Sequence, residues 1–310
     1  MTEQPLVSIL IANFNNARFI TETLDSALGQ TYRNLEIVII DDGSTDDSRR
    51  VIKEYMARHQ DVAFKYVQNS DNQGCGRIKR QCIESSSGAF FTFLDPEDTI
   101  VPEAIETLMQ VLLDHPDLGI AYCTHYLCNE ALEPQGVSTY PGKIPEGQSH
   151  LTSTGGHISA LAVCRRAVYD KTEGINATYQ VSEDQDLYLK MEEQAPVCFI
   201  DKPMYFYRKH DHNSSWNERK VFNNFYWRYH CVKAAYLRRK KSGSPVANIS
   251  KLEMDRMSFS YFLRLGKDRW RKGSIFSAAW SWVRTIPFLY TQWRQRYGPF
   301  KSIGYQQIFH

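Results

Sequence analysis

The sequence predicts an α/β protein, in which a mainly parallel sheet with flanking helices is followed by a C-terminal helical region. Short apolar runs of strand length alternate with longer amphipathic segments through the first half of the chain, as in repeated β-α-β units covered by helices on both faces. From Trp216 onward the pattern is helical. The length of 310 residues allows two domains or one large α/β unit.

The expected elements follow in order along the chain. Strands are expected at residues 7–11, 36–40, 63–67, 90–94 and 120–126, and helices at residues 17–29, 47–58, 76–86 and 102–114. Pro102 suits the first turn of the last of these helices. This first part is Rossmann-like. Residues 127–160 are rich in Gly, Pro, Ser and Thr, which predicts a long excursion at the sheet edge, where binding sites are often completed.

A second stretch of strands and helices follows that excursion. It contains an apolar run at residues 158–164, an acidic helix that begins at residues 182–184, and strands near residues 197–200 and 204–208. The helical region after it is interrupted at residues 242–245. We therefore expect a domain at residues 1–215, with parts at about 1–126 and 127–215, and a basic, aromatic-rich tail at residues 216–310.

The formal net charge of +2 is a cancellation between two unlike parts of the chain. Residues 1–216 contain 18 basic and 31 acidic residues, a net charge of −13. Residues 217–310 contain 19 basic and 4 acidic residues, a net charge of +15, together with five of the six tryptophans. The chain therefore joins an acidic part to a basic, aromatic-rich part.

The composition excludes several classes of protein. The sequence has no low-complexity tract, no solenoid-length repeat and no collagen-like bias. Its seven cysteines form no Cys-x-x-Cys pair, which favours reduced thiols over a disulfide framework or a zinc site. The first residues lack the pattern of a signal peptide, so we expect a cytoplasmic protein.

Polar and acidic segments follow three of the expected strands. They are residues 13–16, 41–46 and 95–98. Solvated turns with helix-capping side chains would explain any one of them, but ligands bind at the carboxyl ends of parallel strands, so the three together indicate a site. Carboxylates without a Cys or His cluster suit Mg²⁺ or Mn²⁺. No Walker loop and no Gly-x-Gly-x-x-Gly loop follows the first strand, which argues against P-loop and dinucleotide enzymes.

Three blocks resemble, in content, order and spacing, the signature of family 2 glycosyltransferases, which have the GT-A fold. They are residues 7–15 (Val-Ser-Ile-Leu-Ile-Ala-Asn-Phe-Asn), 36–46 (ending Asp-Asp-Gly-Ser-Thr-Asp) and 93–98 (Phe-Leu-Asp-Pro-Glu-Asp). The resemblance covers about residues 5–210. It implies an inverting hexosyl- or N-acetylhexosaminyl-transferase, which uses a nucleotide-sugar bound by residues 1–126 and an acceptor bound by residues 127–215.

The resemblance implies that the nucleotide-sugar lies over the strand ends. Asp42 would accept a hydrogen bond from the nucleobase, and a carboxylate that faces an imide N–H favours uracil and so a UDP-sugar. Arg77 or Lys79 would contact the diphosphate, although a basic exposed helix face is the commoner explanation. The other residues expected to bind the nucleotide-sugar are Ala12, Asn13, Phe14, Asn15, Asp41, Asp95 and Pro96.

Residues 95–98 match the metal-binding Asp-x-Asp region of the family, with Glu97 where the family usually has Asp. The extra methylene keeps the carboxylate but displaces an ion by about its own length. The expected ligands of Mn²⁺ or Mg²⁺ are Asp95, Glu97 and His210. His210 ends a segment that resembles the strand-end block of the family, and a structural or exposed histidine is an equal alternative.

The Glu-Asp-Gln-Asp-Leu segment at residues 183–187 resembles the element of the family whose first Asp acts as general base. That role falls on Asp184, at a helix N-terminus that favours the ionised carboxylate. Ser182 as a helix N-cap, followed by acids in the first turn, is the structural explanation of the same residues. Glu183, Asp98 and Arg208 are expected beside the acceptor.

The basic tail lies beyond the resemblance. Residues 273–292 are apolar and aromatic with flanking Lys and Arg, but Arg284 and Pro287 interrupt them, so a transmembrane helix is not expected. A helix in the headgroup zone of an anionic membrane fits this mixture. Nucleic-acid binding is the alternative for such a mixture, and the acidic first part argues against it. Packing on the first part, or on a second subunit in a homodimer, stays open.

We therefore expect a cytoplasmic enzyme on the inner face of the plasma membrane. Its acceptor would be a saccharide, lipid-linked and part of a surface polysaccharide. A sugar nucleotidyltransferase is one alternative, although it should carry a Gly-rich phosphate loop after its first strand. A non-catalytic polysaccharide- or membrane-binding protein is the other, and its function would survive Asp184→Asn.

Overall fold

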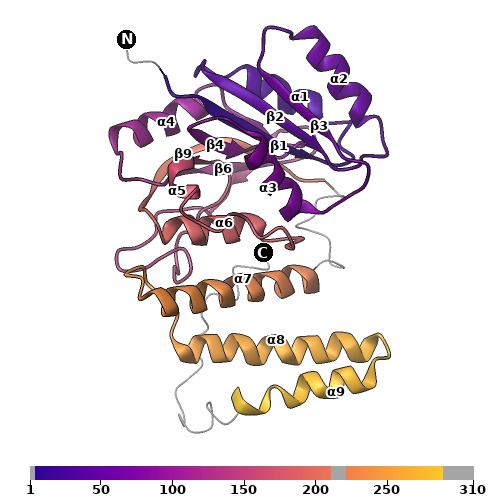
Figure 1. Cartoon of the computed structure of the whole chain (residues 1–310), viewed down its shortest axis with the longest axis vertical. Helices are drawn as coiled ribbons and strands as arrows, with labels where there is room; N and C mark the ends of the chain where they lie inside the picture. The colour runs from indigo at the N-terminus through magenta and orange to yellow at the C-terminus, as the bar shows by residue number, and fades with distance from the viewer. Residues whose placement is uncertain (1–3, 211–220, 289–310) are drawn as a thin grey trace.

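The computed structural model describes residues 4–210 and 221–288, and its centre is a mixed β-sheet with helices on both faces (Figure 1). The strands lie in the order β3-β2-β1-β4-β8-β6-β9-β5, with β7 paired to β6. Their bounds are β1 Val7–Asn13, β2 Leu35–Asp41, β3 Phe64–Gln68, β4 Phe90–Phe93, β5 Thr99–Ile100, β6 Ile120–Cys128, β7 Pro134–Val137, β8 Ala162–Arg165 and β9 Val197–Arg208. Strands β3, β2, β1 and β4 are parallel, as are β6 and β9, whereas β8 runs antiparallel between β4 and β6.

Strands β1 and β2 are buried on both faces, and each face of the sheet packs on its own layer of helices. In β1, Ile9 and Ile11 belong to one core and Leu10 to the other, because successive side chains of a strand point to opposite faces. The first core is covered by α1 (Ile20–Leu28), α2 (Ser48–Arg58) and α4 (Ala104–Asp114), and the second by α3 (Cys75–Ser85), α5 (Arg166–Tyr169) and α6 (Glu183–Glu192). This double burial fixes the polar residues that follow β1, β2 and β4 at one edge of the sheet.

Some predicted elements differ from the structure. The runs at residues 197–200 and 204–208 form one strand, β9, whose register against β6 shifts at Thr124. Helix α4 begins at Ala104, two residues after Pro102. Ser182 is the N-cap residue of α6, as expected, and acids follow it in the first turn, but at a φ of 65° its side chain makes no capping hydrogen bond. Strands β5 and β7 and the one-turn helix α5 were not predicted.

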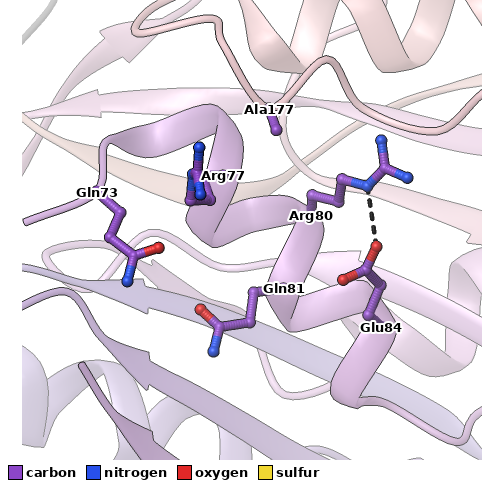
Figure 2. A pocket seen from close by; sticks show the side chains of 6 residues that line it. All are labelled: Gln73, Arg77, Arg80, Gln81, Glu84 and Ala177. Atoms are coloured by element: carbon purple, nitrogen blue, oxygen red, sulfur yellow. Dashed lines mark hydrogen bonds and ion pairs between the residues drawn. The ribbon is translucent and has the colours of Figure 1, made fainter.

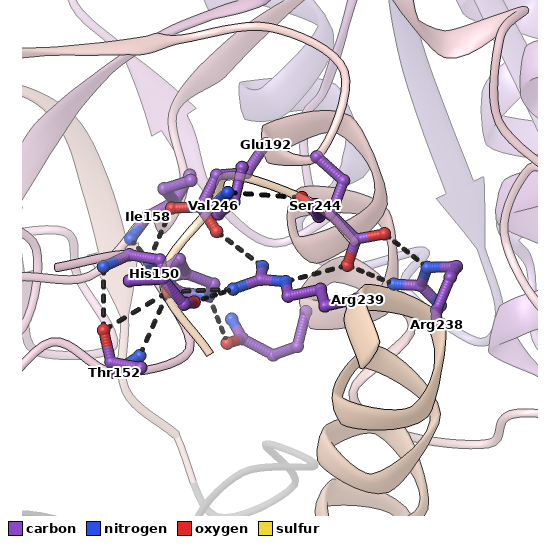
Figure 3. Close-up of polar contacts among 12 residues, drawn as sticks. His150, Thr152, Ile158, Glu192, Arg238, Arg239, Ser244 and Val246 are labelled. Atoms are coloured by element: carbon purple, nitrogen blue, oxygen red, sulfur yellow. Dashed lines mark hydrogen bonds and ion pairs between the residues drawn. The ribbon is translucent and has the colours of Figure 1, made fainter. Parts of the chain in front are cut away.

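The described part of the basic tail consists of three helices, α7 (Val221–Ser242), α8 (Lys251–Arg271) and α9 (Ile275–Val283). Figure 1 shows them stacked one below another, with α7 next to α6. Helix α7 is bound to the end of α6 through ion pairs of Arg238 with Glu193 and of Arg239 with Glu192 and Glu193 (Figure 3). The first helix of the tail is therefore packed on the α/β part.

Helix α9 packs closely on α8 and leaves its outer side in solvent. A Cβ at Gly266 in α8 would lie 2.1 Å from Nε1 of Trp282, so the two helices approach at a position that has no side chain. On the outer side, Phe276 is 93% exposed and Trp280 is 64% exposed. No helix within residues 4–210 and 221–288 is both long and apolar enough to cross a membrane. Trp216 and residues 289–292 of the expected interfacial segment lie outside the described residues.

Candidate active site

The ends of β1 and β2 are joined by a buried polar network. Asn13 and Asp41 are paired in the sheet register, and Nδ2 of Asn13 donates to Oδ2 of Asp41 at 2.9 Å and to Oγ of Ser44 at 3.2 Å. Asp41 also accepts from the Ser44 amide at 3.0 Å and from Nε of Arg49 at 3.2 Å. Oδ1 of Asn13 has no hydrogen-bond partner among the described residues. Asn13 therefore keeps an unused acceptor at the strand end, whereas Asp41 holds the loop.

The carboxylate of Asp42 points to the loop before α3. Its Oδ1 accepts from the Gln73 amide at 2.8 Å, and its Oδ2 accepts from the Gly74 amide at 3.0 Å. Gly43, with a φ of 75°, permits this approach, because a Cβ there would lie 2.6 Å from the carbonyl carbon of Asp71. Each carboxylate oxygen can accept more than one hydrogen bond, so Asp42 is oriented by the loop and can still bind a donor.

The turn after β1 presents residues expected to bind the nucleotide-sugar. Asn15 has a φ of 56°, its amide donates to Oγ of Ser44 at 2.9 Å, and its Oδ1 accepts from the Thr45 amide at 2.8 Å. Phe14 is 42% exposed beside it, and Ala12 is half-buried. The side chain of Asn15 therefore fixes the turn, and the ring of Phe14 presents an exposed apolar surface beside it.

The two basic residues expected at the diphosphate lie on different sides of α3. Lys79 is buried, and its Nζ lies 2.9 Å from Oε1 of Glu183 and 3.7 Å from Oδ1 of Asp95. Arg77 is exposed on the outer side of the helix, where it lines a pocket of about 400 Å³ with Gln73, Arg80, Gln81, Glu84 and Ala177 (Figure 2). Only Lys79 is therefore brought to the carboxylates at the strand ends.

Lys79 and the first turn of α6 form one electrostatic cluster. Burial disfavours the ammonium, but the charges of Glu183 and Asp95 outweigh it and raise the pKa of Lys79 well above its ordinary value. Burial also disfavours the charged form of Glu183, and the adjacent Lys79 outweighs it, so the pKa of Glu183 is lowered. Burial and the charge of Glu183 together raise the pKa of Asp184. Glu183 is thus held as an anion, and Asp184 is the carboxyl that binds a proton more readily.

The expected metal ligands are only partly gathered. Oε1 of Glu97 and Nε2 of His210 lie 3.4 Å apart, whereas Asp95 faces Lys79. Within the residues that the structure describes, no group of three or more His, Cys, Asp or Glu side chains is arranged to hold a metal ion. Two carboxylates and an imidazole are ligands that Mn²⁺ accepts, so the three residues fit such an ion by their chemistry, and two of them also by position.

Asp98 and Arg208, expected beside the acceptor, connect β9 to the strand-end loop. Burial and the charge of Asp95 raise the pKa of Asp98 well above its ordinary value, and its carboxyl accepts from the Tyr205 hydroxyl at 2.6 Å and from the Arg208 amide at 2.7 Å. The guanidinium of Arg208 donates to the carbonyl oxygen of Glu97 at 2.6 Å. Both side chains therefore support the loop that carries Asp95 and Glu97.

Sequence reasoning missed one member of this cluster, Cys75. Its thiol donates to Oε1 of Glu183 at 3.1 Å, on the same side of α3 as Lys79. The spacing of four residues between Cys75 and Lys79, which places both on one face of a helix, was the available signal. Pro96, expected to contact the nucleotide-sugar, is buried between Asp95 and Glu97.

A family model described as Glycosyl transferase family 2 matches residues 8–172. The chondroitin synthase of Escherichia coli is 30% identical over 217 residues, which cover 68% of this chain and 30% of that protein. The hyaluronan synthase of Pasteurella multocida is 28% identical over 212 residues, which cover 68% of this chain and 21% of that protein. The chain thus spans less than a third of the length of these two relatives.

Solved structures share the fold. S. aureus TarS (residues 1–349), solved in complex with UDP-GlcNAc, matches with a TM-score of 0.60 at 18% identity, over 93% of this chain and 91% of that one. A mannosyltransferase from Pyrobaculum calidifontis, solved with GDP-Man and Mn²⁺, matches with a TM-score of 0.55 at 15% identity, over 95% of this chain and 80% of that one. At these identities the likeness concerns the fold.

Proposed function

The chain belongs to glycosyl transferase family 2, and on that premise we propose that it transfers a sugar from a UDP-sugar to a hydroxyl of a saccharide acceptor, with inversion at the anomeric carbon. The observation that carries the proposal is the cluster in which Lys79 joins Asp95, just after β4, to Glu183, the neighbour of Asp184. One buried cation thereby connects the expected phosphate side of the site to the expected base.

The donor is proposed to lie over the ends of β1 and β2. Asp42 would accept from the imide N–H of uracil, while the amides of Gln73 and Gly74 keep its carboxylate in place. Asn13 has an acceptor without a partner among the described residues at the same edge, and Phe14 offers an exposed ring for stacking. When the donor is bound, the ammonium of Lys79 would also interact with the negatively charged diphosphate. UDP-GlcNAc in the complex of TarS supports uridine as the base.

Asp184 is proposed as the general base that takes the proton of the attacking hydroxyl. A base works best when its pKa approaches the working pH, and the raised pKa of Asp184 meets that requirement better than an ordinary aspartate does. Glu183, which is paired with Lys79, is already committed as an anion. Direct attack on the anomeric carbon, from the face opposite the departing UDP, gives inversion.

A divalent cation, Mn²⁺ or Mg²⁺, is proposed as cofactor. Asp95, Glu97 and His210 would hold it, and when bound it supplies positive charge to the departing diphosphate. The proposal is supported by the adjacency of Glu97 and His210, and by Mn²⁺ in the complex of the Pyrobaculum mannosyltransferase. Arg208 and Asp98 would keep the loop that carries Asp95 and Glu97 in place through their hydrogen bonds.

The acceptor is proposed to be a growing, lipid-linked surface polysaccharide at the inner face of the plasma membrane. The names of the chondroitin and hyaluronan synthases among the relatives support a polysaccharide. The exposed apolar side chains on the outer side of α9 support the proposed membrane contact, because the surface of a soluble protein rarely gathers such side chains. They are Ile275, Phe276, Trp280 and Val283 of α9, together with Ile286 just after the helix, and we call these five side chains the α9 ridge. Exposed Arg271 and Lys272 beside this ridge would face anionic headgroups.

The test is a panel of nucleotide-sugars offered to the purified chain with and without Mn²⁺, read as release of nucleoside diphosphate with saccharide acceptors. We expect turnover with a UDP-sugar, and a product whose anomeric configuration, read by NMR, is opposite to that of the donor. No binding and no turnover with any donor would overturn the proposal. Pyrophosphate released from a sugar phosphate and UTP would instead identify a nucleotidyltransferase.

A further inference from the structure

Helix α6 is held at both ends by one short loop. The backbone amide of His150 donates to Oε1 of Glu192, the last residue of the helix, at 2.6 Å. The imidazole Nε2 of the same residue lies 2.7 Å from Oε1 of Gln185 in the first turn. Gln185 and Glu192 are seven positions apart, about two helical turns. The loop therefore spans α6 along its length.

The hydrogen bonds of His150 define its protonation. Nδ1 accepts from the Ile158 amide at 3.0 Å, so the ring proton is on Nε2 and is donated to Gln185. Burial, with a further effect of the neighbouring His157, lowers the pKa of His150 to about 3. The ring therefore stays neutral and keeps this donor at any working pH. The backbone amide of Gln185 donates to Oδ1 of Asp184 at 2.7 Å.

The loop is itself fixed by the basic tail. Arg239 of α7 is 2% exposed, and its guanidinium donates to Oε2 of Glu192 at 2.8 Å and to Oγ of Ser149 at 2.9 Å (Figure 3). Its Nε donates to Oε1 of Glu193 at 3.0 Å. Arg239 thus binds, with one planar group, the residue before His150 and the helix end to which His150 is bonded.

The geometry points to Arg239 as a positioning residue for sugar transfer: through Ser149, His150 and Gln185 it fixes the first turn of α6 and the carboxylate of Asp184. The inference rests on the proposed role of Asp184 as base. It gives the tail a part in the active site itself, separate from any contact with membrane. A misplacement of a base by about 1 Å costs about 10²-fold in rate, so the effect is measurable.

Arg238 provides a matched control. It immediately precedes Arg239 in α7, and its guanidinium pairs with Glu193 at 2.8 Å, but neither Ser149 nor Glu192 is among its partners in the described structure. In the full chain we expect Arg239→Met to lower kcat about 10²-fold with KM for the UDP-sugar changed less than about twofold, and Arg238→Met to leave kcat near wild type. Arg239→Lys should recover part of kcat.

A second variant keeps the inference testable if Arg239→Met does not fold. Gln185→Met removes only the acceptor of His150 and leaves the ion pairs of α7 in place, and we expect the same fall in kcat with KM unchanged. Full kcat in Gln185→Met, or equal losses in Arg238→Met and Arg239→Met, would overturn the inference.

Hydrogen exchange separates this inference from the proposed function. In Arg239→Met, and not in Arg238→Met, the amides of residues 183–187 should exchange faster, by mass spectrometry of the peptide that contains them. Unchanged exchange in both variants would overturn the positioning role of Arg239, even if the enzyme is active. A wild-type chain that transfers no sugar would overturn the proposed function. The exchange result would still decide whether Arg239 fixes the first turn of α6.

Discussion

Among single residues, Asp184 carries the sharpest prediction. Asp184→Asn keeps the size of the side chain but removes the proton acceptor, so kcat should fall about 10²- to 10⁴-fold. Binding of UDP, measured by calorimetry, should stay within about twofold, because Asp42 and Lys79 remain. Asp201→Asn, at an exposed position in β9, is the control. Unchanged kcat in Asp184→Asn would contradict the assignment of Asp184 as the general base.

The pH dependence follows from the same residue. Burial and Glu183 raise the pKa of Asp184, and a base must be ionised to accept a proton. Activity should therefore fall as the pH drops through that raised value, above the ordinary aspartate value of about 3.9. The measurement is kcat/KM of the folded enzyme across acid pH, and a fall that begins only near 3.9 would contradict the assignment.

The metal role has its own test at Glu97. EDTA should abolish turnover and added Mn²⁺ or Mg²⁺ should restore it, because the ion would neutralise the departing diphosphate. Glu97→Gln should raise the Mn²⁺ concentration for half-maximal activity about 10-fold or more. Glu103→Gln, at a surface ion pair with Lys202, should not. Equal turnover in EDTA would contradict the metal role and leave the transferase proposal standing.

Contacts within the site were predictable only for residues at the ends of adjacent predicted strands. Asn13 and Asp41 are the last residues of adjacent parallel strands and Asp42 comes next, so their position at one edge follows from the apolar runs before them. The contact of Lys79 with Glu183 joins segments more than 100 residues apart, and no periodicity encodes it. The divergence of Arg77 from Lys79 depends on which face of α3 packs on the sheet.

At the scale of elements, the fit of α8 on α9 predicts a packing defect. A Cβ at Gly266 would lie 2.1 Å from Nε1 of Trp282, so Gly266→Ala must displace the indole. We expect a loss of about 1–3 kcal/mol in the free energy of unfolding of the tail helices, read by tryptophan fluorescence in denaturant. Ser260→Ala, in the same helix, is the control. An unchanged midpoint would show that α9 is held elsewhere.

Strongly periodic elements were predicted well, and weakly patterned ones were not. The long apolar runs of β1, β2 and β6 lie within one to two residues of their expected bounds. Strand β5 has two residues, too few for any period, and β7 is exposed throughout, so neither has a hydrophobic signal. Strand β9 was expected as two strands because polar Asp201 and Lys202 interrupt its apolar residues.

For the whole molecule, the division into acidic and basic parts predicts a salt-dependent membrane contact. The full chain should sediment with vesicles that contain anionic lipid and dissociate as salt rises, since each basic residue near the surface contributes about 1 kcal/mol at low salt. Phe276→Ser with Trp280→Ser should weaken this binding, because both side chains are exposed on the α9 ridge.

The control for that experiment is an exposed apolar residue outside the tail. Val137→Ser, in β7, removes a comparable exposed side chain from the α/β part and should leave vesicle binding unchanged. Failure of the wild-type chain to bind anionic vesicles at low salt would remove the membrane contact from the proposal.

The stacking of α7, α8 and α9 has a consequence for the length of the acceptor. Packed helices are spaced about 8–10 Å apart, so two such steps separate the axis of α7, which adjoins α6, from that of α9. With the α9 ridge on the bilayer, Asp184 would stand about 20 Å or more above the lipid. The tail would then set the distance between the bilayer and the active site. A sugar joined directly to its lipid would not reach Asp184, so the enzyme would extend glycans that are already several units long.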